Sequence, residues 1–424
     1  PPSVCLSPLH RLESSLLNEM TRSSNFLSGL RSIPELEDEP KAAKLTDHDR
    51  KAVQELRELV KEHLTPYYDT DFNLLRWLIG HDYDLEKIKP KLINHLLLRK
   101  HENWKLDEVA STPRNHPVHR YWMSGLTKEA EVTPNAILNI EQTGFTDFVG
   151  ITSSFASNEI LKARVHDIEC MLKSVMEMEQ KTGERASIIF VMDLTNLKLD
   201  RKLTSLITGS LGSLSTFMSD HYVELVHTFV IANAPSFFHM LWSLARPLLP
   251  ERTRTKVNVL SSSWQLEMLD IAHPSALPEF WNIGSSTVFT APLQRSNEMV
   301  PLELYYKGSM PKDSEVMIVK AGKTGTDERV LQEGQIVHYT IRGDGHFAFA
   351  IYYSNDPERD GEGVENWELI YPLFTKIPGS SNSIPLTDFI HCKKSGTYRL
   401  WISNEHAWFH TLKITHHLKI EDPL

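Results

Sequence analysis

The most apolar part of this chain lies between residues 220 and 264, where two short apolar runs flank a helical pattern. Residues 228–232 and 256–260 are predicted to be strands, because short continuous apolar runs between turn signals are typical of strands buried on both faces. Between them, apolar residues recur at helical spacing until prolines end the pattern. The apolar positions of this helix are Phe237, Phe238, Leu241, Leu244 and Leu248.

The same alternation of buried strand and helix begins near residue 115. Apolar runs at residues 137–140 and 188–192 precede the two already named, and helical patterns separate all four. Strands of this kind, joined by helices, indicate an α/β unit with a mainly parallel sheet. We place this unit at residues 115–285.

The region before this unit is predicted to be helical at residues 46–104. Thr46 with Asp49 three positions later has the pattern of a capping box, and helical spacing follows. Pro90 is expected to kink the last of these helices or to reset its start. Residues 1–45 are Ser-rich and acidic, which suits a mobile arm. They lack an initiator Met and a signal pattern, which indicates a fragment or a processed form.

The region after the unit has the period of strands. A linker at residues 286–310 precedes short alternating runs separated by Gly, Asn, Asp and Pro, which predicts an all-β sandwich at residues 311–421. The candidate strands are residues 315–319, 335–341, 346–353, 397–402 and 411–420. The fold class is therefore multidomain, α/β plus all-β.

Charge and cysteine usage narrow the functional classes. A net charge of −10 argues against a nucleic-acid partner, which requires a basic face. The three cysteines are far apart in sequence and fit neither a disulfide framework nor a zinc site. Every apolar run is shorter than the ~20 residues that a spanning helix needs.

Residues 220–264 resemble the CRAL-TRIO lipid-binding and lipid-transfer family. Its members carry an acidic-aromatic lead-in, an Asn-Ala-Pro turn, an apolar helix ending in Arg/Lys-Pro-x-Leu, and a Thr-x-x-Lys strand. Residues 72–78 (FNLLRWL) with 83–85 look like the family's helical cap, and residues 187–194 (SIIFVMDL) look like its core strand. Beyond residue 310 the chain resembles a GOLD domain, the β-sandwich that follows the lipid module in the supernatant-protein-factor branch.

The resemblance implies a role for each part of this window. The apolar helix would be a movable lid over a cavity for one lipid, and Glu224, Thr253 and Lys256 would contact an inositol headgroup. A solvated ion pair near a helix end is the alternative for these polar residues, and an ordinary core is the alternative for the lid. The cationic side chains expected to dock on membranes are Arg246, Arg252 and Arg254.

One departure from the family pattern affects the choice of lipid. The phosphoinositide-binding members carry an Arg-Lys pair just before the position of Tyr83, where this chain has His81-Asp82. An anion in place of a cation weakens phosphate binding, so phosphatidylinositol is one candidate ligand beside tocopherol-like, squalene-like and retinoid lipids.

No pattern in the sequence supports catalysis or a metal centre. Residues 322–324 (GKT) lack the first glycine of a phosphate loop, and no G-x-S-x-G is present. His406 and His410 have no third ligand, and Asp193 has no recognisable partner. We therefore expect no enzyme, no metal and no cofactor other than a bound phospholipid or isoprenoid-like lipid.

Two aromatic segments in the sandwich have two interpretations each. Residues 346–353 (HFAFAIYY) and 406–409 (HAWF) could form a surface for a protein partner or the core of the sandwich. We interpret both as core, because alternating large aromatics in a sandwich are usually buried.

The combined expectation is a soluble lipid-binding or lipid-transfer protein that docks transiently on membranes. The expected location is cytoplasmic, with peripheral association to Golgi or endosomal membranes. The alternative is a trafficking adaptor that a lipid regulates and whose GOLD-like domain binds protein partners.

Overall fold

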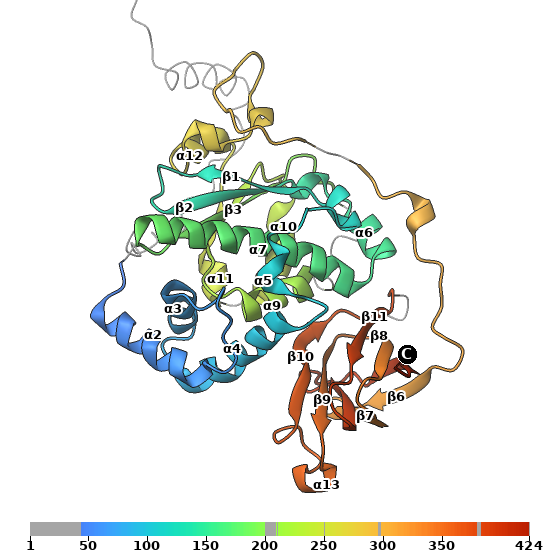
Figure 1. Ribbon diagram of the computed structural model, residues 1–424. Helices are drawn as coiled ribbons and strands as arrows, with labels where there is room; N and C mark the ends of the chain where they lie inside the picture. The colour runs from blue at the N-terminus through green and yellow to red at the C-terminus, as the bar shows by residue number, and fades with distance from the viewer. Residues whose placement is uncertain are drawn as a thin grey trace, which may run out of the picture.

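The computed structural model describes residues 44–199, 209, 211–249, 251–295, 298–379 and 383–423. Nearly all of the predicted arm at residues 1–45 lies outside this range. Three parts follow one another along the chain: a helical cap, an α/β unit and a β-sandwich (Figure 1). The predicted fold class, multidomain α/β plus all-β, is confirmed.

The cap consists of four helices: α2 (Asp47–Val60), α3 (Asp71–Gly80), α4 (Leu85–Lys100) and α5 (Leu106–Val109). The capping box forms as predicted, since Thr46 Oγ1 accepts from the Asp49 amide at 3.1 Å and Asp49 accepts from the Thr46 amide at 2.9 Å. The expectation that Pro90 resets the helix start is wrong, because α4 runs through it from Leu85. Pro90 lies early in α4, so its missing N–H removes one hydrogen bond near the first turn.

The α/β unit is built on a five-stranded sheet whose strands follow one another in chain order. Its strands are β1 (Ser124–Glu129), β2 (Ala136–Glu141), β3 (Ser187–Asp193), β4 (Val226–Ala232) and β5 (Val257–Val259). β2 to β5 are parallel and coincide with the four predicted apolar runs. β1, which is antiparallel to β2, was missed.

The helices between the parallel strands lie on one face of this sheet. Right-handed crossovers between strands in chain order place α7 (Ser157–Thr182), α9 (Gly212–His221) and α10 (Phe238–Ala245) on the same side. Side chains of α7 and α9 share a hydrophobic cluster with Ile188 and Phe190 of β3. The opposite face packs on α12 (Trp264–Leu269) and the segment after it. The described residues of the unit also form the α-helices α6 (Phe148–Ser154) and α11 (Glu251–Thr255).

The sandwich has two four-stranded antiparallel sheets, with orders β10-β9-β12-β7 and β11-β8-β13-β6. Its strands are β6 (Glu315–Val319), β7 (Thr324–Leu331), β8 (Ile336–Gly343), β9 (Phe347–Ser354), β10 (Glu368–Ile377), β11 (Leu386–His391), β12 (Gly396–Ser403) and β13 (Leu412–Glu421). The short helix α13 (Pro357–Asp360) follows β9. The five predicted strands are present, and β7, β10 and β11 were missed.

The sandwich packs directly on the cap and on α9. Phe374 of β10 stacks on Phe217 of α9, with ring centroids 5.8 Å apart, and lies 5.5 Å from Trp104 after α4. The Asn94 side chain bonds both to the amide and to the carbonyl of Leu373, at 2.8 and 3.0 Å. One hydrophobic cluster therefore runs through cap, α/β unit and sandwich.

A fully buried cation holds the cap to the α/β unit. Arg99 of α4 donates to both Glu169 oxygens, at 2.8 and 3.1 Å, and its Nε donates to Asp107 at 2.6 Å. Its guanidinium lies 4.5 Å from the Tyr68 ring centroid. Burial alone would lower the pKa of Arg99, but Glu169 and Asp107 outweigh it and raise that pKa above its ordinary value. Arg99 therefore stays charged.

No helix in the described part of the chain is long and apolar enough to cross a membrane.

Replacing Arg99 by Met should destabilise the protein strongly. The change leaves Glu169 buried without its cation, and breaking a buried pair in this way costs about 3–5 kcal/mol. Urea unfolding measures this loss. The control is Lys87→Met, because Lys87 is exposed and pairs with Asp84 at the surface. Equal stability of the two variants would contradict the role assigned to Arg99.

Candidate functional site

The apolar helix predicted after Asn233 is α10, which continues as a 3-10 turn at Arg246–Leu248. Leu241 is buried, whereas Phe237 and Phe238 are partly exposed. Leu244, expected on the same apolar face, is 41% exposed. The side chain of Leu248 lies outside the described residues.

Leu241 is buried but belongs to none of the hydrophobic clusters formed by the described residues. Among the described residues, none of the apolar side chains of α10 belongs to a hydrophobic cluster of the sheet or the other helices. Ile231 of β4, which is 4% exposed, is likewise in none of them. Its register partners Met192 and Val259 extend the row across β3, β4 and β5. This row lies near the carboxyl ends of the three strands.

The outer side of α10 is also apolar. Met240 and Leu244, one turn apart, are 45% and 41% exposed. Arg246 follows them at the surface, and neither it nor Arg254 forms an ion pair within the described residues. This side combines exposed apolar groups with cations, as a surface that meets lipid does.

The predicted polar residues do come together, but their charges are already paired. Lys256 Nζ donates to Glu224 at 2.7 Å and to the Val226 carbonyl at 3.1 Å. Arg252 of α11 lies 3.6 Å from Glu224 and forms an ion pair with Asp82. We refer to Asp82, Glu224, Arg252 and Lys256 as the charge cluster.

The charge cluster joins the cap to the segment after α10. Asp82 and Glu224 both have left-handed backbones, with φ of 53° and 52°, which non-glycine residues seldom adopt. Gly80 permits the close approach, because a Cβ there would lie 2.0 Å from Val223 Cγ1. Strained backbones of this kind concentrate at functional sites.

Two other predicted site residues, Thr253 and Arg252, both lie on α11. Thr253 lies on α11, where its carbonyl accepts from the Lys256 amide at 3.2 Å. Arg252 was expected to dock on membranes, but the structure places it in the charge cluster. Residues 82 and 252 are 170 positions apart in the chain, and no motif in the sequence pairs them. They meet only in the folded chain.

Asp193 has partners that the sequence did not reveal. It is fully buried at the end of β3 and accepts from the Thr195 amide and from Trp281 Nε1, both at 2.9 Å. Arg295 pairs with it at 3.1 Å and lies 4.1 Å from the Phe280 ring centroid. Asp193 thereby ties the end of the α/β unit back to the sheet, and its role is structural.

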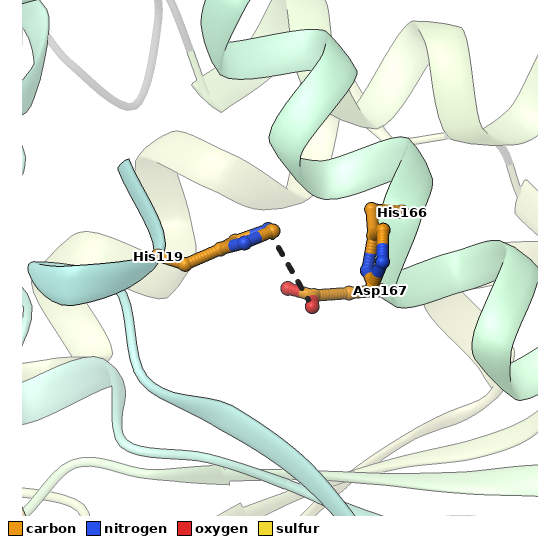
Figure 2. Close-up of side chains that lie close together, drawn as sticks. All are labelled: His119, His166 and Asp167. Carbon is orange, nitrogen blue, oxygen red and sulfur yellow. Dashed lines mark ion pairs between the residues drawn. The ribbon is translucent and has the colours of Figure 1, made fainter. Parts of the chain in front are cut away.

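A second cluster contains His119, His166 and Asp167, the last two on α7 (Figure 2). His119 Nε2 lies 3.7 Å from Asp167 but donates to the Ala163 carbonyl at 2.8 Å, and His166 Nε2 donates to the Thr112 carbonyl at 2.9 Å. Burial lowers the pKa of His119 to about 4, so it is neutral.

Two guanidinium groups already neutralise the carboxylate of this cluster. Asp167 accepts from Arg114 at 2.7 Å and from Arg164 at 2.9 Å. Cations at these positions repel a metal ion, so the cluster fits a structural clasp better than a metal centre.

Comparisons with known protein families give one match for each of the three parts of the chain. The CRAL/TRIO domain family matches residues 141–284. Residues 307–422 match a family described as "F28H7_8_C:-like, C-terminal domain", and residues 45–109 match a domain of unknown function (DUF8435). The name GOLD is not among these descriptions, so that resemblance stays a prediction.

Relatives extend the likeness over most of the chain. The CRAL-TRIO domain-containing protein F28H7.8 of Caenorhabditis elegans is 23% identical over 84% of this chain and 87% of its own length. The phosphatidylinositol/phosphatidylcholine transfer protein SFH12 of Arabidopsis thaliana is 26% identical over 56% of this chain, which spans only 44% of that protein. The crystal structure of Sfh5, 16% identical, covers 51% of this chain and 81% of its own, with a TM-score of 0.41. Residues 141–284 therefore form a CRAL/TRIO domain, and the parts before and after it match other families.

Proposed function

We propose that this chain is a lipid-binding and lipid-transfer protein that encloses one lipid beneath α10. The position of Leu241 and Ile231 carries this proposal: both are buried, yet neither packs into the described core. An apolar ligand that enters between the helix and the row Met192, Ile231 and Val259 would have these two side chains among its walls. The plant relatives named as phosphatidylinositol/phosphatidylcholine transfer proteins support the same class.

Lipid exchange requires a low barrier to leaving a bilayer. A two-chain lipid exposes on the order of thirty methylenes, which at ~0.8 kcal/mol each gives a barrier above 20 kcal/mol. A cavity that opens against the bilayer avoids this exposure. In the proposed mechanism α10 is the lid, Met240 and Leu244 rest in the membrane when it opens, and Arg246 and Arg254 hold it near anionic headgroups. Such a carrier works in the cytoplasm and associates with membranes only peripherally.

The charge cluster decides which headgroups the site accepts. Lys256 and Arg252 have the charges that bind a phosphate, but Glu224 and Asp82 already neutralise them. An anionic headgroup therefore has to displace Asp82 from Arg252, whereas an uncharged isoprenoid does not. The site in this form favours lipids without a phosphate and accepts phosphatidylinositol at a cost.

A second function has support from the sandwich. Phe374 of β10 stacks on Phe217 of α9, and Thr375 bonds to Asp220, four residues before Glu224. A change at the lipid site thus has a direct route to the sandwich. This route suits an adaptor that a lipid regulates and whose sandwich binds proteins.

Transfer between donor and acceptor vesicles, with no other protein present, separates the two functions. A carrier accelerates exchange of a labelled lipid, and native mass spectrometry of the purified protein shows one lipid bound. Bound lipid without any transfer would favour the adaptor.

The two sides of α10 should behave differently when charged. Met240→Asp with Leu244→Asp should leave lipid occupancy unchanged but slow exchange about tenfold or more, because the open lid can no longer rest in a bilayer. Leu241→Asp should lower occupancy instead, since burying an unpaired charge costs several kcal/mol. Native mass spectrometry and vesicle transfer measure the two effects, with folding checked by circular dichroism. Normal transfer by the outward pair would show that α10 is not the lid.

Removing the carboxylate of Asp82 should favour anionic lipids. Asp82→Asn frees Arg252, and a charge-assisted hydrogen bond is worth ~1.5–3 kcal/mol, so phosphatidylinositol should bind about tenfold to hundredfold more tightly. Binding of a neutral isoprenoid should not change. Asp84→Asn is the matched control, because Asp84 pairs with Lys87 outside the cluster and Asn also caps a helix well. Equal effects of the two variants would contradict the competition.

A further inference from the structure

The loop between β12 and β13, residues 404–411, presents two large aromatic side chains to solvent. Trp408 is 87% exposed and Phe409 is 93% exposed. The expectation that residues 406–409 form core is wrong, whereas β9 (Phe347–Ser354) is buried along its whole length as predicted. We refer to Trp408 and Phe409 as the aromatic tip.

The base of the loop is fixed, so the exposure of the tip is built into the fold. Asn404, 4% exposed, donates through Nδ2 to the carbonyls of Val319 at 3.1 Å and His410 at 2.8 Å. Its amide donates to the Lys323 carbonyl at 2.9 Å, and its carbonyl accepts from the Gly322 amide at 3.1 Å. The β6–β7 turn and the aromatic tip are thereby held together.

Exposed cations surround the tip. Lys320 and Lys323 lie in the adjoining turn and Lys413 follows the loop, and none of them forms an ion pair within the described residues. The nearby carboxylate of Asp344 is engaged by His410 at 3.2 Å and by the Lys413 amide at 2.9 Å. Glu405 is bonded to Ser403. These hydrogen bonds leave Asp344 and Glu405 charged, so the three lysines beside two carboxylates give the surroundings of the tip a small net positive charge.

The apolar surface continues from the tip along an edge strand. Ile318 of β6 is 59% exposed and lies opposite Lys413 in the β6–β13 ladder, and Val316 is 54% exposed. β6 is the last strand of its sheet. The strand register places the tip and α13 at opposite ends of the sandwich. Ser403, just before the tip, pairs with Thr324, whereas Gly396 at the other end of β12 pairs with Leu331 and lies near Ser354, just before α13 (Figure 1).

We propose that the aromatic tip is a membrane anchor that inserts into the interface of an anionic bilayer. A lipid bilayer can deform around side chains that project from a protein, and aromatic rings are enriched at the headgroup level of bilayers. The lysines around the tip can then reach lipid phosphates, where each cation adds to binding. This assignment gives the sandwich a membrane contact of its own, separate from α10, and it stands without lipid transfer.

The test uses flotation of the full chain with phosphatidylcholine vesicles, with and without phosphatidylserine. Trp408→Ser with Phe409→Ser should reduce binding to the mixed vesicles about tenfold or more, and Lys320→Glu with Lys323→Glu should remove the preference for phosphatidylserine. Val330→Ser is the matched control, because Val330 is 75% exposed on β7, near the opposite end of that strand from the tip. The control should bind like the unaltered protein.

Each variant is also measured in the Met240→Asp, Leu244→Asp background, so that binding through α10 does not hide the effect. Comparing the fluorescence of the unaltered protein with that of Trp408→Phe isolates Trp408, whose emission should shift to the blue on vesicles. Unchanged flotation of the tip variant would overturn the anchor. A dimer in light scattering that the tip variant converts to monomer would also overturn it, because the tip would then meet a second copy. Vesicle binding without lipid transfer would disprove only the proposed function.

Discussion

The packing of this protein depends on a guanidinium group that has no access to water. Arg99 is the point at which α4, α5 and α7 meet, and Tyr222 at the end of α9 donates to the same Glu169 at 2.8 Å. A charge in this environment persists only while all of its partners are in place. The cap, the long helix of the α/β unit and the segment that leads into β4 therefore keep one relative position.

That fixed position determines where the polar part of the site can form. The end of α3 reaches the turn before β4, where Gly80 meets Val223, and Asp82 forms an ion pair with Arg252 of α11. The sandwich adds a second fixed contact on α9 through Phe374 and Phe217. Parts of the chain that are distant in sequence thus meet at α9 and α11, the helices that precede and follow α10 in the chain.

The sequence predicted central strands well and edge strands poorly, for a physical reason. β2, β3 and β4 were found because burial on both faces demands continuous apolar residues. Two edge strands, β5 and β6, were found as well. The four missed strands, β1, β7, β10 and β11, all lie at the edges of their sheets, where the apolar pattern is weaker. β10 even contains Pro372, which an edge strand tolerates because one side needs no ladder hydrogen bonds.

In the candidate site, the residue types were enough to identify Glu224 and Lys256. The ion pair between them could not be predicted, because it depends on their distance in the folded chain. The exposure of Trp408 could not be predicted either, since composition alone cannot distinguish a buried aromatic side chain from an exposed one.

The contact at Gly80 makes the charge cluster sensitive to a single methyl group. A side chain at this position would have to push Val223 aside, and Val223 immediately precedes Glu224. Moving Glu224 releases Lys256 from its closest partner without altering any charged residue. Lipid preference in this fold can therefore drift during evolution through steric changes in the cap, so relatives that share all four charged residues need not share a ligand.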